Sequence, residues 1–321
     1  MKAHFLNIAA LFAVCASLLF TSCSDSTHTG LNEEGKPIII VPVPPYAKLV
    51  REIAGDAVEI QELISENDDP HTYSPTPKEV ARLGKGMIYF NAGLPFESGL
   101  LHKLSHGTKG LKTIDIVSDL DRRKFAEGEH DHEEEKEDEH KGHDHHGHDH
   151  GHDHEEWDPH VWLSPAHLGR QTLMISEALQ EVVTDEAVAK SIQEKAESYV
   201  ANLHELDIQL ETALAPMKGK SFYVYHGAFG YFADAYGLKQ EAIELNGRTP
   251  EPKALTALVE KAKADGVKMI FVQPQFDQSS AKSLAESIGG QVISINPLAA
   301  DVPANLREIA AQISRSTGSD R

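Results

Sequence analysis

The feature that most restricts the fold of this chain is a long run with helical spacing of apolar residues between Asp185 and Ala215. The spacing alternates between steps of four and three, which predicts one amphipathic helix. With Thr184 as the expected N-cap and Pro216 as the expected stop, the helix has roughly 29 residues and spans roughly 43 Å. The recurring positions are Val188, Ile192, Ala196, Tyr199, Leu203, Leu206, Leu210 and Ala213.

A rod of this length can join two lobes and limit their hinge motion. A coiled coil between two chains is the alternative, but the run holds only about four heptads, and tyrosine and alanine fill seam positions.

Short β-rich runs alternate with helix-like segments on both sides of this rod, which predicts mostly parallel sheets covered by helices. We therefore expect an α/β protein with two parallel-sheet lobes, residues 37–184 and 216–321, joined by a rigid helix at 185–215. The expected strands are Ile38–Val41, Val58–Ile64, Met87–Phe90, Ile114–Val117, Phe222–Tyr225, Ala242–Ile243, Lys268–Val272 and Val292–Ile295. Helices are expected around Pro252–Ala264, Ser279–Ile288 and Pro303–Ser314.

The first 36 residues are expected to direct and tether the chain. The apolar stretch Ile8–Phe20 suits a signal peptide over residues 1–22 and is short for a membrane span. The residues before Cys23 resemble the bacterial lipobox, which implies lipidation of Cys23 and a flexible tether over residues 23–36. A plain signal peptide cut near Ser22 is the alternative. Either reading places the protein outside the cytoplasmic membrane, in a periplasm or at a cell surface.

Charge and cysteine content exclude several kinds of site. The chain has 321 residues and a formal net charge of −20, and the clustered Lys and Arg that nucleic acids require do not occur. Cys15 and Cys23 are the only cysteines, so the body cannot hold an internal disulfide or a Cys-ligated metal. Histidines and carboxylates would have to bind any metal.

A histidine-rich and acidic segment, residues 127–156, interrupts the first lobe. It carries 14 acidic and 2 basic residues, and no apolar residue lies between Gly128 and Glu156, which predicts a disordered surface loop. Imidazole and carboxylate groups suit zinc, copper and nickel, whereas a solvating spacer is the alternative. Ten histidines form this auxiliary metal loop: His130, His132, His140, His143, His145, His146, His148, His150, His152 and His154.

Three further histidines lie in turn-forming surroundings at the ends of expected elements. His71 and His160 each follow an Asp-Pro pair, and His226 directly follows an expected strand. Ligands of open parallel sheets gather at the carboxyl ends of strands, where His71 and His226 are expected. A single histidine at such a position is commonly structural, but the repeated Asp-Pro-His motif favours a binding role.

Five segments in order give the chain a resemblance to the zinc and manganese branch of the solute-binding proteins of ABC importers. The resemblance covers roughly residues 37–314 and implies a metal held in the cleft between two lobes by His71, His160 and His226. In the manganese members of this family the third ligand position resembles a Glu. His226 supplies a third imidazole nitrogen there, which implies zinc and not the harder manganese. The segments are Asp69–Pro77, Asp158–Pro165, His226–Leu238, Gly247–Pro252 and Phe271–Phe276.

The resemblance leaves the fourth ligand open. Relatives carry a carboxylate or leave a water near the last strand, where this chain has Asn296, which can replace an Asp, and Ala299. Asp301 is the nearest acid and the candidate fourth ligand, with water as its rival.

The expected function is to capture Zn²⁺ and deliver it to an ABC permease with its ATPase subunit, as a monomer and not as an enzyme. A metal buffer or adhesin acting through the histidine-rich segment is one alternative. A zinc hydrolase is the other, although no His-Glu-x-x-His element or adjacent general base supports it.

Overall fold

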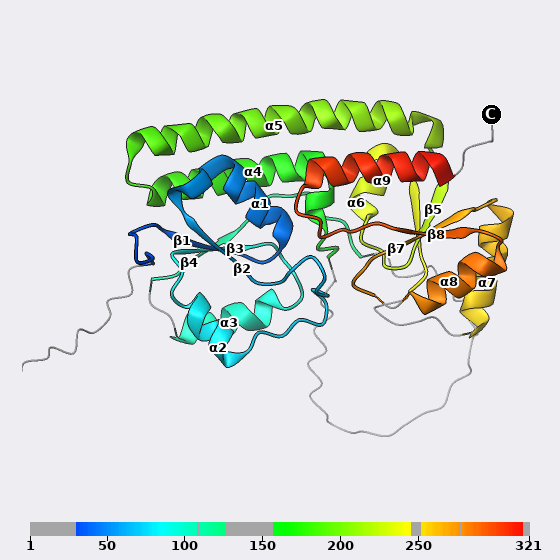
Figure 1. Ribbon diagram of the computed structural model, residues 1–321, viewed down its shortest axis with the longest axis horizontal. Helices are drawn as coiled ribbons and strands as arrows, with labels where there is room; N and C mark the ends of the chain where they lie inside the picture. Colours follow the sequence, from blue (N-terminus) through cyan, green and yellow to red (C-terminus); the bar gives the residue numbers. More distant parts are fainter. Residues whose placement is uncertain (1–29, 108–109, 126–156, 245–251, 277, 317–321) are drawn as a thin grey trace, which may run out of the picture.

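The structure is a computed structural model that describes residues 30–107, 110–125, 157–244, 252–276 and 278–316 (Figure 1). The signal peptide, Cys23 with most of the tether, the auxiliary metal loop and nearly all of segment Gly247–Pro252 lie outside these residues. Predictions about them therefore remain predictions.

Eight strands and nine α-helices alternate along the described residues. In chain order they are β1 (Ile38–Val41), α1 (Pro44–Ala54), β2 (Glu59–Glu62), α2 (Pro77–Leu83), β3 (Ile88–Asn91), α3 (Glu97–Gly107), β4 (Lys112–Asp115), α4 (Pro165–Val182), α5 (Glu186–Leu214), β5 (Ser221–Val224), α6 (Gly230–Tyr236), β6 (Lys239–Ala242), α7 (Pro252–Ala264), β7 (Met269–Val272), α8 (Ser279–Ser287), β8 (Gln291–Ser294) and α9 (Val302–Ser316). Short 3₁₀ turns occupy Gly55–Ala57, Val161–Leu163 and Ala215–Met217.

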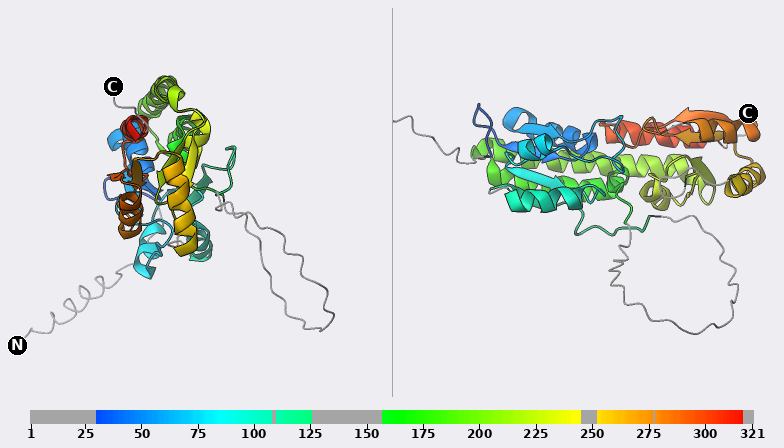
Figure 2. Two further views of the ribbon diagram at one scale, coloured as in Figure 1. Left: turned by 90° about the vertical axis from the view of Figure 1, so that its right-hand side faces the viewer. Right: turned by 90° about the horizontal axis from the view of Figure 1, so that it is seen from below.

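The strands form two four-stranded parallel sheets with the same topology. The first has the order β2-β1-β3-β4 and the second the order β6-β5-β7-β8. β1 is buried along its whole length, as expected of a central strand covered by helices on both faces. The two halves lie end to end in the view from below (Figure 2). Because each half holds a parallel sheet with helices, the expected α/β fold with two lobes is confirmed.

Helix α5 runs along the top of the whole molecule in Figure 1. It has 29 residues, as the sequence predicts. Its N-cap is Asp185 and not Thr184, because the Asp185 side chain accepts hydrogen bonds from the backbone N–H groups of Ala187 and Val188, at 2.9 and 3.1 Å. The helix ends at Leu214, and Pro216 lies in the 3₁₀ turn that follows.

The apolar stripe of α5 packs against both halves of the protein. It contacts α4 and α1 on the first side and α9 and α6 on the second. Leu203, Leu206 and Leu210 are buried as expected, whereas Ala213 is exposed and Leu214 takes the last buried position. One helix therefore fixes the two sheets relative to each other.

One hydrophobic cluster extends through the first half, α5, α6 and α9, and a smaller cluster lies between the second sheet and α7 and α8. No helix among the described residues is long and apolar enough to cross a bilayer.

Most expected strands differ from the observed ones by one or two residues. The largest shifts are at β4, where the edge strand is Lys112–Asp115 and not Ile114–Val117, and at β6, where it is Lys239–Ala242 and not Ala242–Ile243. Just after these two strands the chain buries the apolar side chains Ile116, Val117 and Ile243. The apolar runs in the sequence therefore predict which residues are buried and not which residues form the hydrogen bonds of the sheet.

Candidate metal site

Three histidines from distant parts of the chain converge between the two lobes. His71, His160 and His226 each bring one ring nitrogen to a common point, with these atoms all within 4.8 Å of one another. Nε2 of His71 lies 3.1 Å from Nε2 of His226. Two nitrogens on one tetrahedral zinc lie about 3.3 Å apart when each Zn–N bond is about 2.0–2.1 Å, so this separation suits a shared metal.

Turns at the ends of elements position all three rings. His71 lies in the loop between β2 and α2, His226 follows β5 by two residues, and His160 directly precedes the turn Val161–Leu163. The carboxyl ends of parallel strands thus supply His71 and His226, as expected.

The two Asp-Pro-His motifs use their carboxylates differently. Asp69 Oδ1 accepts a hydrogen bond from the His71 backbone N–H at 2.9 Å and fixes only the turn. Asp158 Oδ1 accepts from the His160 backbone N–H at 3.0 Å and contacts the ring Nδ1 at 2.8 Å. This second motif holds the imidazole itself.

A second carboxylate holds the third histidine. Glu244, which is buried two residues after β6, makes a short contact with Nδ1 of His226. The buried Gln273 brackets the His226 backbone, donating to its C=O at 2.7 Å and accepting from its N–H at 3.0 Å. Because both carboxylates engage Nδ1, the Nε2 atoms of His160 and His226 are left with lone pairs for a metal.

A small cavity at the three rings is lined mostly by apolar groups. Phe125 packs against all three imidazoles with ring centroids 5.8–6.4 Å away, and Phe276 lies 4.9 Å from the His226 ring. The cavity lining comprises the three histidines with Pro70, Gln275, Phe276, Pro297 and Leu298. Gln275 Oε1 is buried and has no hydrogen-bond partner among the described residues.

Burial keeps two of these imidazoles neutral. It lowers the pKa of His71 to about 2, with further lowering by the neighbouring His226 and His160 rings. Burial also lowers the pKa of His160, against the opposing effect of Asp158. Neutral imidazole is the metal-binding form, so the folded site is prepared for a cation.

The structure does not bring Asp301 to the three histidines. Its side chain is exposed, and Oδ1 accepts a hydrogen bond from the Ala304 backbone N–H at 3.0 Å in the first turn of α9. This helix-capping role explains why an acid stands at Asp301 without a metal. Asn296 is also engaged, since its Oδ1 accepts from the Leu298 backbone and from Gln275.

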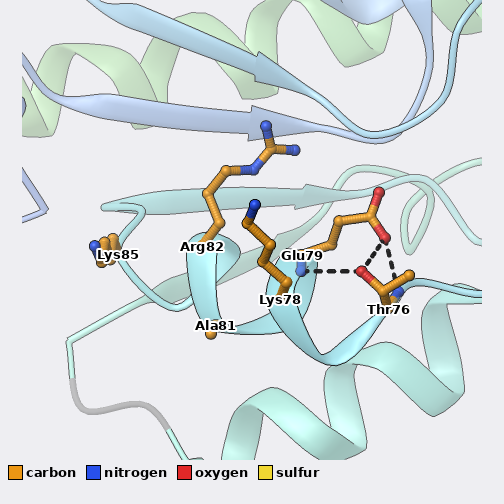
Figure 3. Close-up of a pocket in the computed structure, with 6 residues that line it drawn as sticks. All are labelled: Thr76, Lys78, Glu79, Ala81, Arg82 and Lys85. Atoms are coloured by element: carbon orange, nitrogen blue, oxygen red, sulfur yellow. Dashed lines mark hydrogen bonds between the residues drawn. The ribbon is translucent and has the colours of Figure 1, made fainter.

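A second, more open groove lies over α2 (Figure 3). Its only carboxylate, Glu79, is held by the backbone N–H and hydroxyl of Thr76 in a capping box, and Lys78, Arg82 and Lys85 supply positive charge. A groove lined by basic side chains, with no histidine and no free carboxylate, does not suit a divalent metal ion.

Sequence reasoning missed Glu244 and the ring contact of Asp158. The Asp-Pro-His spacing is a signal for Asp158, because a side chain two residues before a turn residue can reach it. An acid just beyond a strand end is the only local signal for Glu244.

Two parallel-sheet α/β lobes on one rigid helix, with a histidine site between them, define a solute-binding protein of the metal-binding class. The chain belongs to the family described as zinc-uptake complex component A, periplasmic (ZnuA), whose model matches residues 39–313.

Curated relatives support this assignment. The high-affinity zinc uptake system protein ZnuA of Bacillus subtilis is 29% identical over 297 residues, covering 90% of this chain and 88% of that protein. The zinc-binding lipoprotein AdcA of Streptococcus pneumoniae is 31% identical over 300 residues, covering 91% of this chain but 55% of that protein. The chain thus spans about half the length of the AdcA relatives it matches.

Solved structures share the fold. A crystal structure of ZnuA is 30% identical with a TM-score of 0.75, covering 88% of this chain and 100% of that chain. The periplasmic zinc-binding protein TroA of Treponema pallidum is 17% identical with a TM-score of 0.71, covering 89% and 100%. The latter likeness concerns the fold alone.

Proposed function

We propose that this protein captures Zn²⁺ with His71, His160 and His226 and delivers it to an ABC-type permease. One observation carries the proposal: three imidazoles from both lobes converge, and two of them are oriented by buried carboxylates. Such carboxylate–histidine pairs typically fix the ring and strengthen the metal bond.

Charge and ligand type favour zinc over harder cations. Three nitrogens suit zinc better than manganese, which prefers oxygen ligands. Asp158 and Glu244 also place two negative charges directly behind the ligands, so the dipositive ion is partly compensated without a carboxylate bond to it.

For the fourth position we propose a water molecule. The Asp301 carboxylate accepts a hydrogen bond from the backbone at the start of α9, and the Ala299 side chain offers no ligand atom. The unpartnered Oε1 of Gln275 is a suitable acceptor for such a water, and an open position eases release of a transported metal.

Delivery and location rest on the family and on the N-terminal sequence. The name of the Bacillus relative, a high-affinity zinc uptake system protein, supports a role in uptake, and that of the Streptococcus relative, a zinc-binding lipoprotein, supports an anchored extracytoplasmic protein. We propose an ABC permease and its ATPase as the transient partners. We propose lipidation at Cys23 and a monomeric protein. Mass spectrometry of the native N-terminus would refute the lipid by finding an unmodified Cys23.

The histidine-rich segment 127–156 is proposed to add weaker metal sites. The composition of this segment predicts that it does not form a packed core, and ordering such a segment around a metal would cost conformational entropy that a folded cavity does not lose. Deleting it should lower the zinc stoichiometry and leave the tightest dissociation constant nearly unchanged. Loss of the tight site on deletion would favour the buffer or adhesin alternative.

The hydrolase alternative has less support. A general base needs a free carboxylate or imidazole near the metal. Among the described residues, those that line the cavity include no carboxylate, and Asp158 and Glu244 are engaged with ligand rings.

A zinc titration with a chelator competitor tests the proposal. His160→Ala should weaken the tightest site by at least about tenfold, since a ligand is lost and Asp158 is left without its ring partner. His204→Ala, which removes an exposed histidine of α5, is the matched control and should bind as the unaltered protein does. Equal affinities for the two variants would refute the site.

A further inference from the structure

We propose that Arg123 is a positioning residue for the metal site, which holds His160 in its binding orientation through Asp158 and ties that orientation to the second lobe. The inference rests on the proposed zinc-binding function. It concerns how the site is kept assembled: the hydrogen bonds and ion pairs of the Arg123 side chain found among the described residues go to Asp158 and Asp234.

Asp158 is fully buried beside His160. Its side chain has no exposed surface, so its charge must be satisfied within the protein. One oxygen, Oδ1, is used by the backbone and ring of His160. The other, Oδ2, accepts a hydrogen bond from Nη1 of Arg123 at 3.1 Å. Arg123 is the one partner of Oδ2 found among the described residues, so its loss would leave this oxygen of a buried carboxylate unsatisfied there.

Arg123 also reaches the second lobe. Its Nε lies 2.9 Å from Oδ2 of Asp234 on α6, as an ion pair. The backbone of the same segment is fastened there too, because the Arg123 N–H donates to the Tyr231 hydroxyl at 3.2 Å and that hydroxyl donates to the Asp158 C=O at 2.9 Å. One guanidinium thus joins α6 to the carboxylate that orients His160.

The Arg123 guanidinium fills the space beside the first residue of α6. Gly230 begins α6, and a Cβ built there would lie 1.3 Å from Nη1 of Arg123 and 2.8 Å from Oδ2 of Asp158. Only glycine leaves room for Arg123 to lie across the start of this helix. The helix and the arginine therefore fit each other as one contact.

The corresponding carboxylate of the other buried ligand differs. Glu244 engages His226, and no cation pairs with Glu244 among the described residues. His226 is instead fixed through its backbone by Gln273. Among the described residues, the charge that orients His160 is also part of the contact between the lobes, and no such ion pair is found for Glu244. Separation of α6 from Arg123 therefore loosens His160 first.

The test compares the full-length protein with Arg123→Gln and Gly230→Ala. The first removes the guanidinium, and the second displaces it while every charge is kept. Arg122→Gln is the matched control for charge, since Arg122 stacks on Trp157 with its Cζ 5.0 Å from the ring centroid. Gly99→Ala is the control for a helical glycine, because a Cβ there meets nothing within 4 Å. Arg123→Lys is the conservative variant.

Two measurements are made on each variant: the zinc dissociation constant by chelator competition, and the visible absorption spectrum of the Co²⁺ form, which reports ligand geometry. Each variant is compared with its own His160→Ala derivative, so that metal bound elsewhere on the chain cancels. We expect both test variants to bind zinc about tenfold more weakly with an altered Co²⁺ spectrum. Arg123→Lys should restore part of the affinity, and the two controls should match the unaltered protein.

Unchanged affinity and spectrum in Arg123→Gln and Gly230→Ala would overturn the inference while leaving the zinc site intact. An equal loss in Arg122→Gln would also overturn it, because net charge alone would then explain the effect. If the unaltered protein and its His160→Ala variant bind equally, the proposed function fails instead. Should Arg123→Gln not fold, Gly230→Ala and Arg123→Lys still decide the matter.

Discussion

At His71 and His160, burial works against protonation. The free energy needed to place a charged imidazole in this pocket lowers the pKa of His71 to about 2 and lowers that of His160 in the same direction. An unfolded histidine has a pKa of about 6.5. Below that pH the unfolded chain therefore takes up protons that the folded site refuses, and stability falls as the pH decreases.

This difference predicts the pH dependence of unfolding for the metal-free protein. In urea denaturation between about pH 6 and pH 5, the unfolding free energy of His71→Asn should fall by about 1.2 kcal/mol less than that of the unaltered protein, since one histidine no longer titrates on unfolding. Parallel stability curves for the variant and the unaltered protein would contradict the burial of a neutral His71.

The three histidines could be predicted from sequence because turn residues and strand ends surround each of them. The fourth position could not, since Asp301 and Ala299 differ by two residues and only the start of α9 decides where the Asp301 carboxylate goes. Glu244 was equally hidden, because its contact with His226 depends on the pairing of β5 with β6. Such contacts follow from tertiary placement and leave little local signal.

At the scale of one element, the start of α5 offers a direct comparison of two neighbouring capping residues. Asp185 accepts hydrogen bonds from two backbone N–H groups that the helix leaves unpaired, and its negative charge also suits the helix N-terminus. Thr184 is exposed and lies one residue outside this position.

We therefore expect Asp185→Ala to lower the free energy of unfolding by about 1 kcal/mol, and Thr184→Ala to change it by less than about 0.5 kcal/mol. Chemical denaturation followed by circular dichroism measures both. A larger loss in the threonine variant would place the cap where the sequence alone suggested it.

The apolar period of 3.6 residues predicted the length of α5 correctly, because buried or partly buried apolar side chains recur along the helix from Val188 to Leu214. It could not choose between adjacent Thr and Asp, since both are good capping residues. The predicted positions of the edge strands β4 and β6 differ from the observed ones by up to two or three residues. At the edge of a sheet, burial of a side chain depends on the covering helices more than on the hydrogen bonds between strands.

For the whole molecule, the repeated strand order and the single helix α5 explain how a site between lobes stays assembled. The sheets share one topology, and one hydrophobic cluster continues from the first half through α5 to α9. The alternation of strands and helices was enough to predict two α/β lobes. It could not show that their cores merge, because that depends on which faces of α5 and α9 meet.

Zinc is proposed to lie between the lobes, bound by three histidines. The most direct measurement is a crystal structure of the protein loaded with one equivalent of zinc, with anomalous diffraction recorded at the zinc edge. We expect one dominant peak at about 2.0–2.1 Å from a ring nitrogen of each of His71, His160 and His226, with Asp301 still at the start of α9. A dominant peak elsewhere, with these three rings unligated, would contradict the account.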